Sequence, residues 1–456
     1  MANLNPLEIQ ITKITMQKFN GNDKMELMPQ FVELSVYQSI FEPVMKAELL
    51  LNDNIGLFVN YPFTGEEIID IEYRQLAGIG VSESDTTSMK FIIKGVRDIA
   101  LDDRARALMY IVDLVSVEFL QNVRKMVSHA FNDLVEDMAE KVYEEYIKKD
   151  TEEKFKKVKK FTTEESIKVR NLVIPNLRPF QAIQWLAKHA VAKDYEKHFL
   201  YLFYEDNEGF NFVTIQKLIE DAYKDKNKIE QKKYRYISDV ESGLTDKNAK
   251  PDADLYFISN IVNNKRFSSI EKIAGGYYQN ELFEISLLQK NFNSHPTELD
   301  KEAGETALGK YPLNTDSYID YVKNEKKQSE YANRIRYIIN NYEDLNEQNR
   351  TQPQYRYKFG NATKYMYALN QMDFTITVPA NMKLKAGQVI YCDLPEMHGF
   401  NDVQKDKYVS GFFMITEVKQ VMSVGNKVAT SLRINKDGYL SKLSEKSEYT
   451  TANGKL

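Results

Sequence analysis

Two neighbouring β-strands are predicted by the sequence YVSGFFMITEVKQVMSVGNKVATSLRINKDG (408–438). The strand-like stretches are GFFMITEVKQV and KVATSLRI, with turn residues at 424–426 between them. Just upstream, Phe374, Ile376 and Val378 alternate with threonines, and Ala386-Gly387 precedes a further strand-like stretch, QVIYCDL. A period of two places alternate side chains on one face of a sheet, so residues 372–435 are predicted to form β-structure.

The same period appears near the N-terminus. Residues 45–51 and 68–74 alternate in this way, and 107–118 is apolar on nearly both faces, as in a strand covered on both sides. Turn residues at 52–54 and 64–65 separate these segments. Several short strands at this spacing predict a sandwich or barrel.

Between the two β regions the period changes to three and four. This spacing predicts an amphipathic helix and is carried by Phe131, Leu134, Val135, Met138 and Val142. The following segment, 141–160, is densely charged and is typical of a solvated helix face or a mobile link, with a polyanion-binding patch as the lesser alternative. A helix is expected to start near Pro179, and a hairpin is expected to turn through 206–209.

The predicted fold class is α+β, mostly β, with two similar antiparallel β-barrel or sandwich (tube-like) domains, a helical middle region and a polar insertion. A helix is also expected around 328–344, within that insertion. The predicted ranges are 1–118 for the first tube-like β domain, 119–205 for the helical and hairpin middle domain, 206–292 and 356–440 for the second tube-like β domain, 293–355 for the polar excursion, and 441–456 for a flexible tail.

Composition excludes several classes of protein. The 456 residues carry a formal net charge of −5, which argues against a dedicated nucleic-acid binder. The segments KKYRYISD (232–239) and YRYKFGNATKYMY (355–367) mix basic and aromatic residues, which fits either a single-strand-binding surface or a charged edge strand; the net charge favours the edge strand. No signal peptide or membrane span is expected, and folding in a reducing cytosol is predicted.

No motif for catalysis or metal binding emerges. The single cysteine, Cys392, excludes an intrachain disulfide and a zinc site built on Cys pairs. Cys392 and His398 could form a nucleophile pair, but Cys392 lies in an alternating strand and is expected to be a small buried apolar residue. The other histidines, at 129, 189, 198 and 295, are dispersed, and His129 and His189 lie in helical patterns.

Other short motifs are weak. Gly78-Ile79-Gly80 lacks the third glycine of a dinucleotide-binding loop and is expected to be a turn. Acid pairs such as Glu66/Glu67 and Asp102/Asp103 are uninformative in a chain with 66 acids, and the segments 52–54 and 205–209 lack the full calcium-loop pattern and are expected to be turns. We therefore predict no catalytic, cofactor-binding or metal-binding residues and no cofactor.

Three ordered stretches resemble a known family, the central baseplate hub protein of contractile-tailed, T-even-like phages, which is related to the hub part of type VI secretion spike proteins. The stretches are 31–74 with its TGEE turn, NLVIPNLRPFQAIQWLAKHA (171–190) with the hairpin 199–212, and KLKAGQVIYCDLP (383–395) with 408–438. These ordered pieces are spread over most of the chain, but each is a structural pattern and not a catalytic motif.

The resemblance implies a structural, non-enzymatic homotrimer in which the two β domains of each chain present six similar units. Such a hub joins a sixfold tail tube to a threefold central spike, with baseplate wedge and tape-measure proteins as further partners, while DNA passes through the lumen without specific binding. It implies a location in the tail baseplate of the virion, after assembly in the host cytoplasm. The alternatives are a wall-degrading enzyme of the tail tip, acting on peptidoglycan or polysaccharide, and a nucleic-acid channel or binder.

Overall fold

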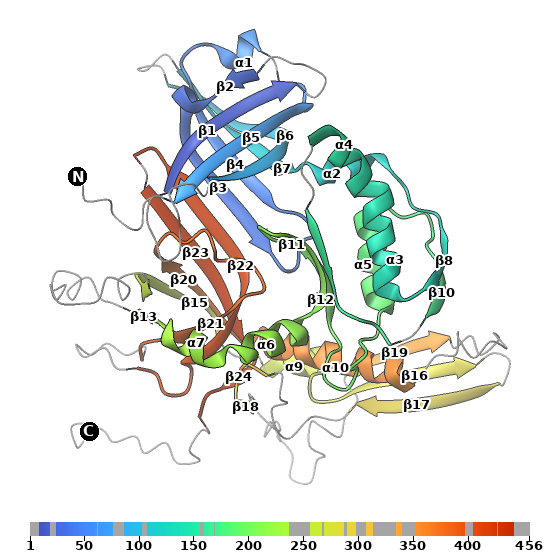
Figure 1. Ribbon diagram of the computed structural model, residues 1–456. Helices are drawn as coiled ribbons and strands as arrows, with labels where there is room; N and C mark the ends of the chain where they lie inside the picture. Colours follow the sequence, from blue (N-terminus) through green and yellow to red (C-terminus); the bar gives the residue numbers. More distant parts are fainter. Residues whose placement is uncertain are drawn as a thin grey trace, which may run out of the picture.

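The protein is described by a computed structural model (Figure 1). It describes residues 9–18, 24–61, 63–75, 86–102, 107–155, 159–167, 169–236, 256–266, 269–286, 290–297, 307–312, 334–339, 353–396, 405–425 and 427–441. One large sheet forms the left and upper part of Figure 1, a helical region lies to its right, and a small sheet with several helices forms the base.

The first β region forms one half of the large sheet. Its strands run in the order β3-β4-β7-β6-β5-β1-β2, and every neighbouring pair is antiparallel. The predicted strands at 45–51, 68–74 and 107–118 are confirmed as β4, β5 and β7. The elements are β1 (Ile9–Lys18), β2 (Lys24–Glu26), η1 (Met28–Gln30), β3 (Phe31–Ser39), β4 (Lys46–Asp53), α1 (Leu57–Asn60), β5 (Glu67–Gln75), β6 (Thr86–Asp102) and β7 (Ala107–Ser116).

The second β region continues the same sheet. The two strands predicted from 408–438 are β22 and β23, which pair in antiparallel register from Met414↔Asn435 to Ser423↔Lys427. β22 also pairs with β3, from Glu417↔Ser39 to Ser423↔Glu33, and so joins the two β regions edge to edge. The elements are β13 (Tyr234–Tyr236), β14 (Phe257–Ile258), β15 (Asn260–Arg266), β20 (Met372–Val378), β21 (Val389–Asp393), β22 (Gly411–Ser423), β23 (Lys427–Lys436) and β24 (Gly438–Tyr439). The fold class, α+β and mostly β, is confirmed.

The middle region packs helices against the three-stranded sheet β11-β12-β9. The predicted hairpin is β11 and β12, and the helix starting at Pro179 is α5. Its elements are α2 (Glu118–Arg124), β8 (Ala130–Asp133), α3 (Val135–Tyr143), η2 (Glu144–Lys148), α4 (Lys149–Phe155), β9 (Lys160–Thr163), β10 (Arg170–Val173), α5 (Pro179–His189), β11 (Tyr201–Glu205) and β12 (Gly209–Thr214).

Three expectations for the middle region are corrected. The helix starts at Val135, while Phe131 lies in β8 opposite Leu172; both Phe131 and Met138 enter the same core, which explains their shared spacing. The charged segment 141–160 is not wholly solvated, because Tyr143 and Ile147 are buried in that core. His129 precedes β8 and is not helical.

The base of the molecule holds helices and a second three-stranded sheet, β17-β16-β19 (Figure 1). The elements are α6 (Ile215–Lys224), α7 (Lys226–Gln231), α9 (Ser269–Gly275), β16 (Asn280–Ser286), β17 (Asn291–Thr297), β18 (Tyr311–Pro312), β19 (Arg334–Ile339) and α10 (Pro353–Leu369). No helix in the described ranges is long and apolar enough to span a membrane.

Two predictions for this part are wrong. The helix expected around 328–344 is replaced at 334–339 by β19, because RIRYII has the alternation and β-branched residues of a strand and pairs in parallel with β16. The segment 355–367 belongs to α10 and is neither an edge strand nor an extended stacking platform. The other basic-aromatic segment forms β13, which lies between β14 and β21, and its residues 237–239 lie outside the described ranges.

Candidate functional site

The cysteine considered for catalysis from the sequence is enclosed. Cys392 lies in β21 with 0% exposure, and burial raises the pKa of its thiol. His398, Asp103 and the Gly78-Gly80 turn lie outside the described ranges. Among the residues that the structure describes, no group of three His, Cys, Asp or Glu side chains is placed to hold a metal ion.

The acidic turn motifs close turns. Both oxygens of Asp53 accept backbone N–H groups at the start of α1, from Leu57 at 2.7 Å and Phe58 at 2.8 Å. Asp206 Oδ1 accepts the N–H groups of Glu208 and Gly209 at 2.8 and 3.0 Å. The turn expected at 205–209 is confirmed. The turn expected at 52–54 is displaced, because Asn52 and Asp53 still pair with β7 as the end of β4 and the chain bends from Asn54.

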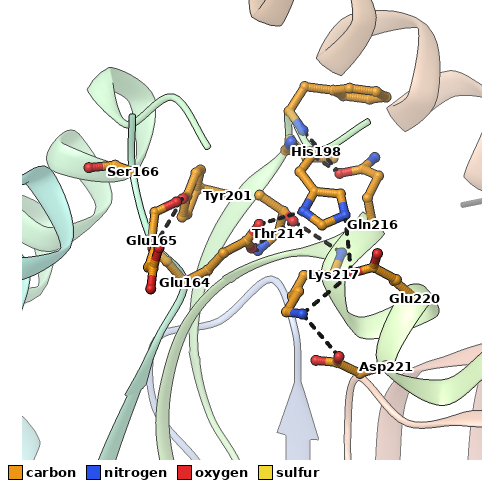
Figure 2. A network of polar contacts seen from close by, with 12 residues as sticks. Glu164, Glu165, Ser166, His198, Tyr201, Thr214, Gln216, Lys217, Glu220 and Asp221 are labelled. Atoms are coloured by element: carbon orange, nitrogen blue, oxygen red, sulfur yellow. Dashed lines mark hydrogen bonds and ion pairs between the residues drawn. The ribbon is translucent and has the colours of Figure 1, made fainter. Parts of the chain in front are cut away.

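A buried Glu–His contact is the arrangement closest to acid–base machinery (Figure 2). Glu164 Oε1 lies 2.7 Å from His198 Nδ1, and both side chains are less than 10% exposed. Glu164 Oε2 accepts hydrogen bonds from the backbone N–H and the hydroxyl of Thr214, both at 2.7 Å. On the other side of the ring, His198 Nε2 is 3.7 Å from Glu220 Oε2.

These contacts hold secondary-structure elements together. Thr214 Oγ1 also accepts the N–H of Lys217 at 3.1 Å and caps α6, and Gln216 Oε1 accepts the N–H of Leu200 at 3.2 Å. Figure 2 shows the side chains converging from the segment after β9, the start of β11, and α6. Both oxygens of Glu164 are occupied, and His198 Nε2 is buried next to Glu220, so the network holds three segments together.

A polar groove of about 880 Å³ lies where the two β regions meet. A row of side chains crosses four strands there: Arg97 (β6), Glu48 (β4), Tyr37 (β3) and Lys419 (β22). Arg97 Nη2 lies 2.5 Å from Glu48 Oε1, Tyr37 OH donates to Glu48 Oε2 at 2.7 Å, and Lys419 Nζ lies 5.3 Å from the Tyr37 ring centroid. The row bridges the β3–β22 junction.

The arginines of this groove are matched by carboxylates. Arg97 Nε also lies 3.0 Å from Asp113 Oδ1, and the hydrogen bonds to Asp113 raise the pKa of Arg97. Arg433 contacts Asp373 at 2.7 Å and Glu417 at 3.0 Å, and these partners raise its pKa in the same way. The groove therefore has a polar floor in which both arginines are neutralised by neighbouring carboxylates, while Lys94 and Lys419 also line it.

A buried charge cluster links the first β region to the middle region. Lys159 Nζ donates to Ser116 Oγ at 2.6 Å, to Glu118 Oε2 at 2.7 Å and to Glu205 Oε1. Glu205 Oε2 accepts the N–H of Met45 at 2.9 Å. Burial alone would lower the pKa of Lys159, but the two carboxylates outweigh it and raise that pKa. The sequence shows no local signal for this cluster, because its members lie in four separate segments, at 45, 116–118, 159 and 205.

Comparisons with known proteins give structural likenesses only. No family model matches the sequence, and no curated protein matches it. A prophage MuSo2 43 kDa tail protein from Shewanella oneidensis is 9% identical, with 93% of this chain and 98% of that chain covered and a TM-score of 0.49. A tail protein from Neisseria meningitidis MC58 is 10% identical, with coverage of 93% and 96% and a TM-score of 0.47.

A third solved structure is a component of the type VI secretion system of E. coli, described as structurally similar to the T4 tail proteins gp27 and gp5. It is 8% identical, with 96% of this chain and 80% of that chain covered and a TM-score of 0.40. Tail proteins and a component of the type VI secretion system are thus among the solved structures that this chain is similar to.

Proposed function

We propose that this chain is a non-enzymatic structural subunit of a contractile injection machine, a homotrimeric hub that joins a sixfold tail tube to a threefold central spike. The observation that carries the proposal is the β3–β22 pairing, which fuses two β regions of one chain into a single, mainly antiparallel sheet, in which β13 pairs in parallel with β14 and β21. Three such chains arranged with cyclic symmetry would present six β regions, which resolves the mismatch between a threefold and a sixfold neighbour.

The charge distribution supports the same role. The groove at the junction is lined by arginines that carboxylates already neutralise, and the chain as a whole is slightly acidic. A hub through which DNA passes without specific binding needs surfaces of this kind, because unmatched cations would hold the phosphates.

The oligomeric state tests the proposal. Light scattering of the purified chain at micromolar concentration should give about three times the chain mass of 53.1 kDa, and electron micrographs should show rings. A stable monomer with no rings would contradict the hub role.

The open edge of β15 is the expected subunit contact. Within the described ranges this seven-residue strand pairs only with β20, whereas the other end strands, β2 and β14, are shorter. Val262 on β15 is 49% exposed, and a charge on an edge strand opposes strand addition. We expect V262D to lower the trimer fraction in light scattering, while V59D, at a 74% exposed valine on α1, leaves it unchanged. Equal trimer fractions in both variants would place the contact elsewhere.

A further inference from the structure

A second cavity lies between the middle region and the base, away from the polar groove. Its volume is about 760 Å³, and it is enclosed by α5 and β11 on one side and by β19 and α10 on the other. In Figure 1 this is the place where the lower end of α5 approaches α10. The size is that of a pocket for an organic ligand or a peptide segment, and exceeds what one small inorganic ion would fill.

The charges of this cavity are one-sided. Lys188, Arg334, Arg336 and Lys358 all line it, and the lining that the structure describes contains no Asp or Glu. Lys358 is already used, since its Nζ donates to backbone carbonyl groups at the end of α5. Within the described ranges, Lys188 and the two arginines are therefore the cations of the lining that have no carboxylate partner.

Arg334 and Arg336 are two residues apart on β19, so they lie on the same face of that strand. Within the described ranges neither guanidinium forms an ion pair with a carboxylate, in contrast to Arg97 and Arg433. Burial lowers the pKa of Arg336, and the charge of Arg334 lowers it further. A bound carboxylate would relieve this repulsion and could accept the paired N–H groups of a guanidinium.

The rest of the wall is apolar and aromatic. Leu200, Phe203 and Met366 line the cavity, and the guanidinium carbon of Arg336 lies 5.6 Å from the ring centroid of Phe359. A ligand that fits both parts of the wall carries a negative charge next to an apolar group. Aspartate or glutamate adjacent to leucine or phenylalanine in a peptide has this character.

We propose that the cavity between α5, β11, β19 and α10 binds an acidic peptide segment of another protein, with a carboxylate on Arg334 and Arg336 and an apolar side chain against Phe359 and Met366. The shape and charge of the cavity within one chain carry this assignment, which goes beyond the scaffold role and does not depend on the oligomeric state.

Calorimetric titration of the full chain with the peptide acetyl-Phe-Asp-Leu-Glu-amide tests the assignment. Binding should weaken by about tenfold or more in the double variant R334Q/R336Q, the factor that corresponds to about 1.4 kcal/mol. The matched control R235Q removes a 62% exposed arginine on β13 and should bind like the wild type. Equal binding by all three proteins, or no binding by the wild type at millimolar peptide, would overturn the assignment.

Further measurements separate the possible sources of the negative charge and guard against misfolding. The peptide with Asn and Gln in place of its acids should not bind, and binding to the wild type should weaken as ionic strength rises from about 0.05 M to about 0.5 M. Inorganic phosphate should not displace the peptide at equal concentration; full displacement would show that the site takes a free anion and that the peptide assignment is wrong. If the double variant fails to unfold cooperatively, the single variant R336Q and the salt dependence decide the outcome.

Discussion

Two lysines, the half-buried Lys159 and the buried Lys358, hold the middle region to the rest of the molecule in different ways. Lys159 contacts two buried carboxylates, Glu118 and Glu205, which are 3% and 1% exposed. The link to the first β region runs from Lys159 to Ser116 and from Glu205 to the N–H of Met45. Lys358, on α10, ties it to the base through backbone carbonyl groups: its Nζ donates to Ala187 O at 2.7 Å, to Lys188 O at 3.1 Å and to Ala190 O.

The second arrangement caps a helix. The last carbonyl groups of α5 have no partners within the helix and carry the negative end of its dipole. Lys358 covers three carbonyls at and just beyond this end, and Arg170 Nη1 donates to the carbonyl of His189 at 3.2 Å. Two cations from distant segments therefore meet at one helix terminus.

The two lysines differ in the charge of their partners: Lys159 contacts carboxylates with a full negative charge, whereas Lys358 contacts carbonyl oxygens with a partial one. The carboxylates raise the pKa of Lys159, whereas burial, with some repulsion from Arg170, lowers the pKa of Lys358 to about 7. Carbonyl dipoles oppose the cost of burying an ammonium less effectively than carboxylates do. The junction with the first β region therefore stays charged at neutral pH, while the junction with the base sits close to its titration point.

The largest effect is expected for K159M. This substitution leaves Glu118 and Glu205 facing each other without a cation, and breaking a buried pair in this way costs roughly 3–5 kcal/mol. Urea denaturation should show this loss in the free energy of unfolding. The control K193M removes an ion pair with Glu165 whose side chains are 73% and 72% exposed, and should change stability by less than about 1 kcal/mol. Similar losses in both variants would mean that Lys159 is not a buried partner.

A smaller loss, about 2 kcal/mol, is expected for K358M. The variant removes charge-assisted hydrogen bonds but leaves no buried carboxylate unpaired. Each such bond contributes on the order of 1.5–3 kcal/mol to stability, and the cost of burying the ammonium has to be subtracted from this gain. The same denaturation experiment measures it. A loss larger than that of K159M would reverse the order of the two junctions.

The pH dependence should distinguish the two lysines most finely. The pKa of Lys358 is about 7 in the folded protein and about 10.4 when unfolded, so between these values the unfolded chain binds more protons and stability rises with pH. The stability difference between wild type and K358M should therefore grow from pH 7 to pH 9, by at most about 1.4 kcal/mol per pH unit. Lys272 and Lys436, whose pKa values burial lowers to about 8, are present in both proteins and cancel. A constant difference would show that Lys358 does not titrate in this window.

The sequence predicts the elements that depend on local features: alternating apolar residues, a proline at a helix start and turn residues. β4, β5, β7, β22 and β23 follow from a period of two, and α5 follows from Pro179 at its first position. The β11–β12 hairpin follows from its turn residues; at Gly209 (φ 150°) any Cβ would lie 2.1 Å from the carbonyl oxygen of Lys160, so only glycine fits.

The failures share a physical cause. β19 and α10 lie in the polar, Tyr-rich part of the chain, where the pattern of apolar residues is weak and neighbouring elements decide the structure. The spacing of three and four includes Phe131 because the short strand β8 and the following helix α3 both place apolar side chains in one core.

Burial of one face of each strand or helix leaves a periodic pattern along the chain, and this pattern is sufficient to predict two β regions around a helical middle. The pairing of β22 with β3 and the partners of Lys159, Lys358 and Arg336 are visible in the three-dimensional fold and not in the pattern. These contacts join segments far apart in sequence. The sequence does not distinguish a lysine that contacts two buried carboxylates from an exposed lysine.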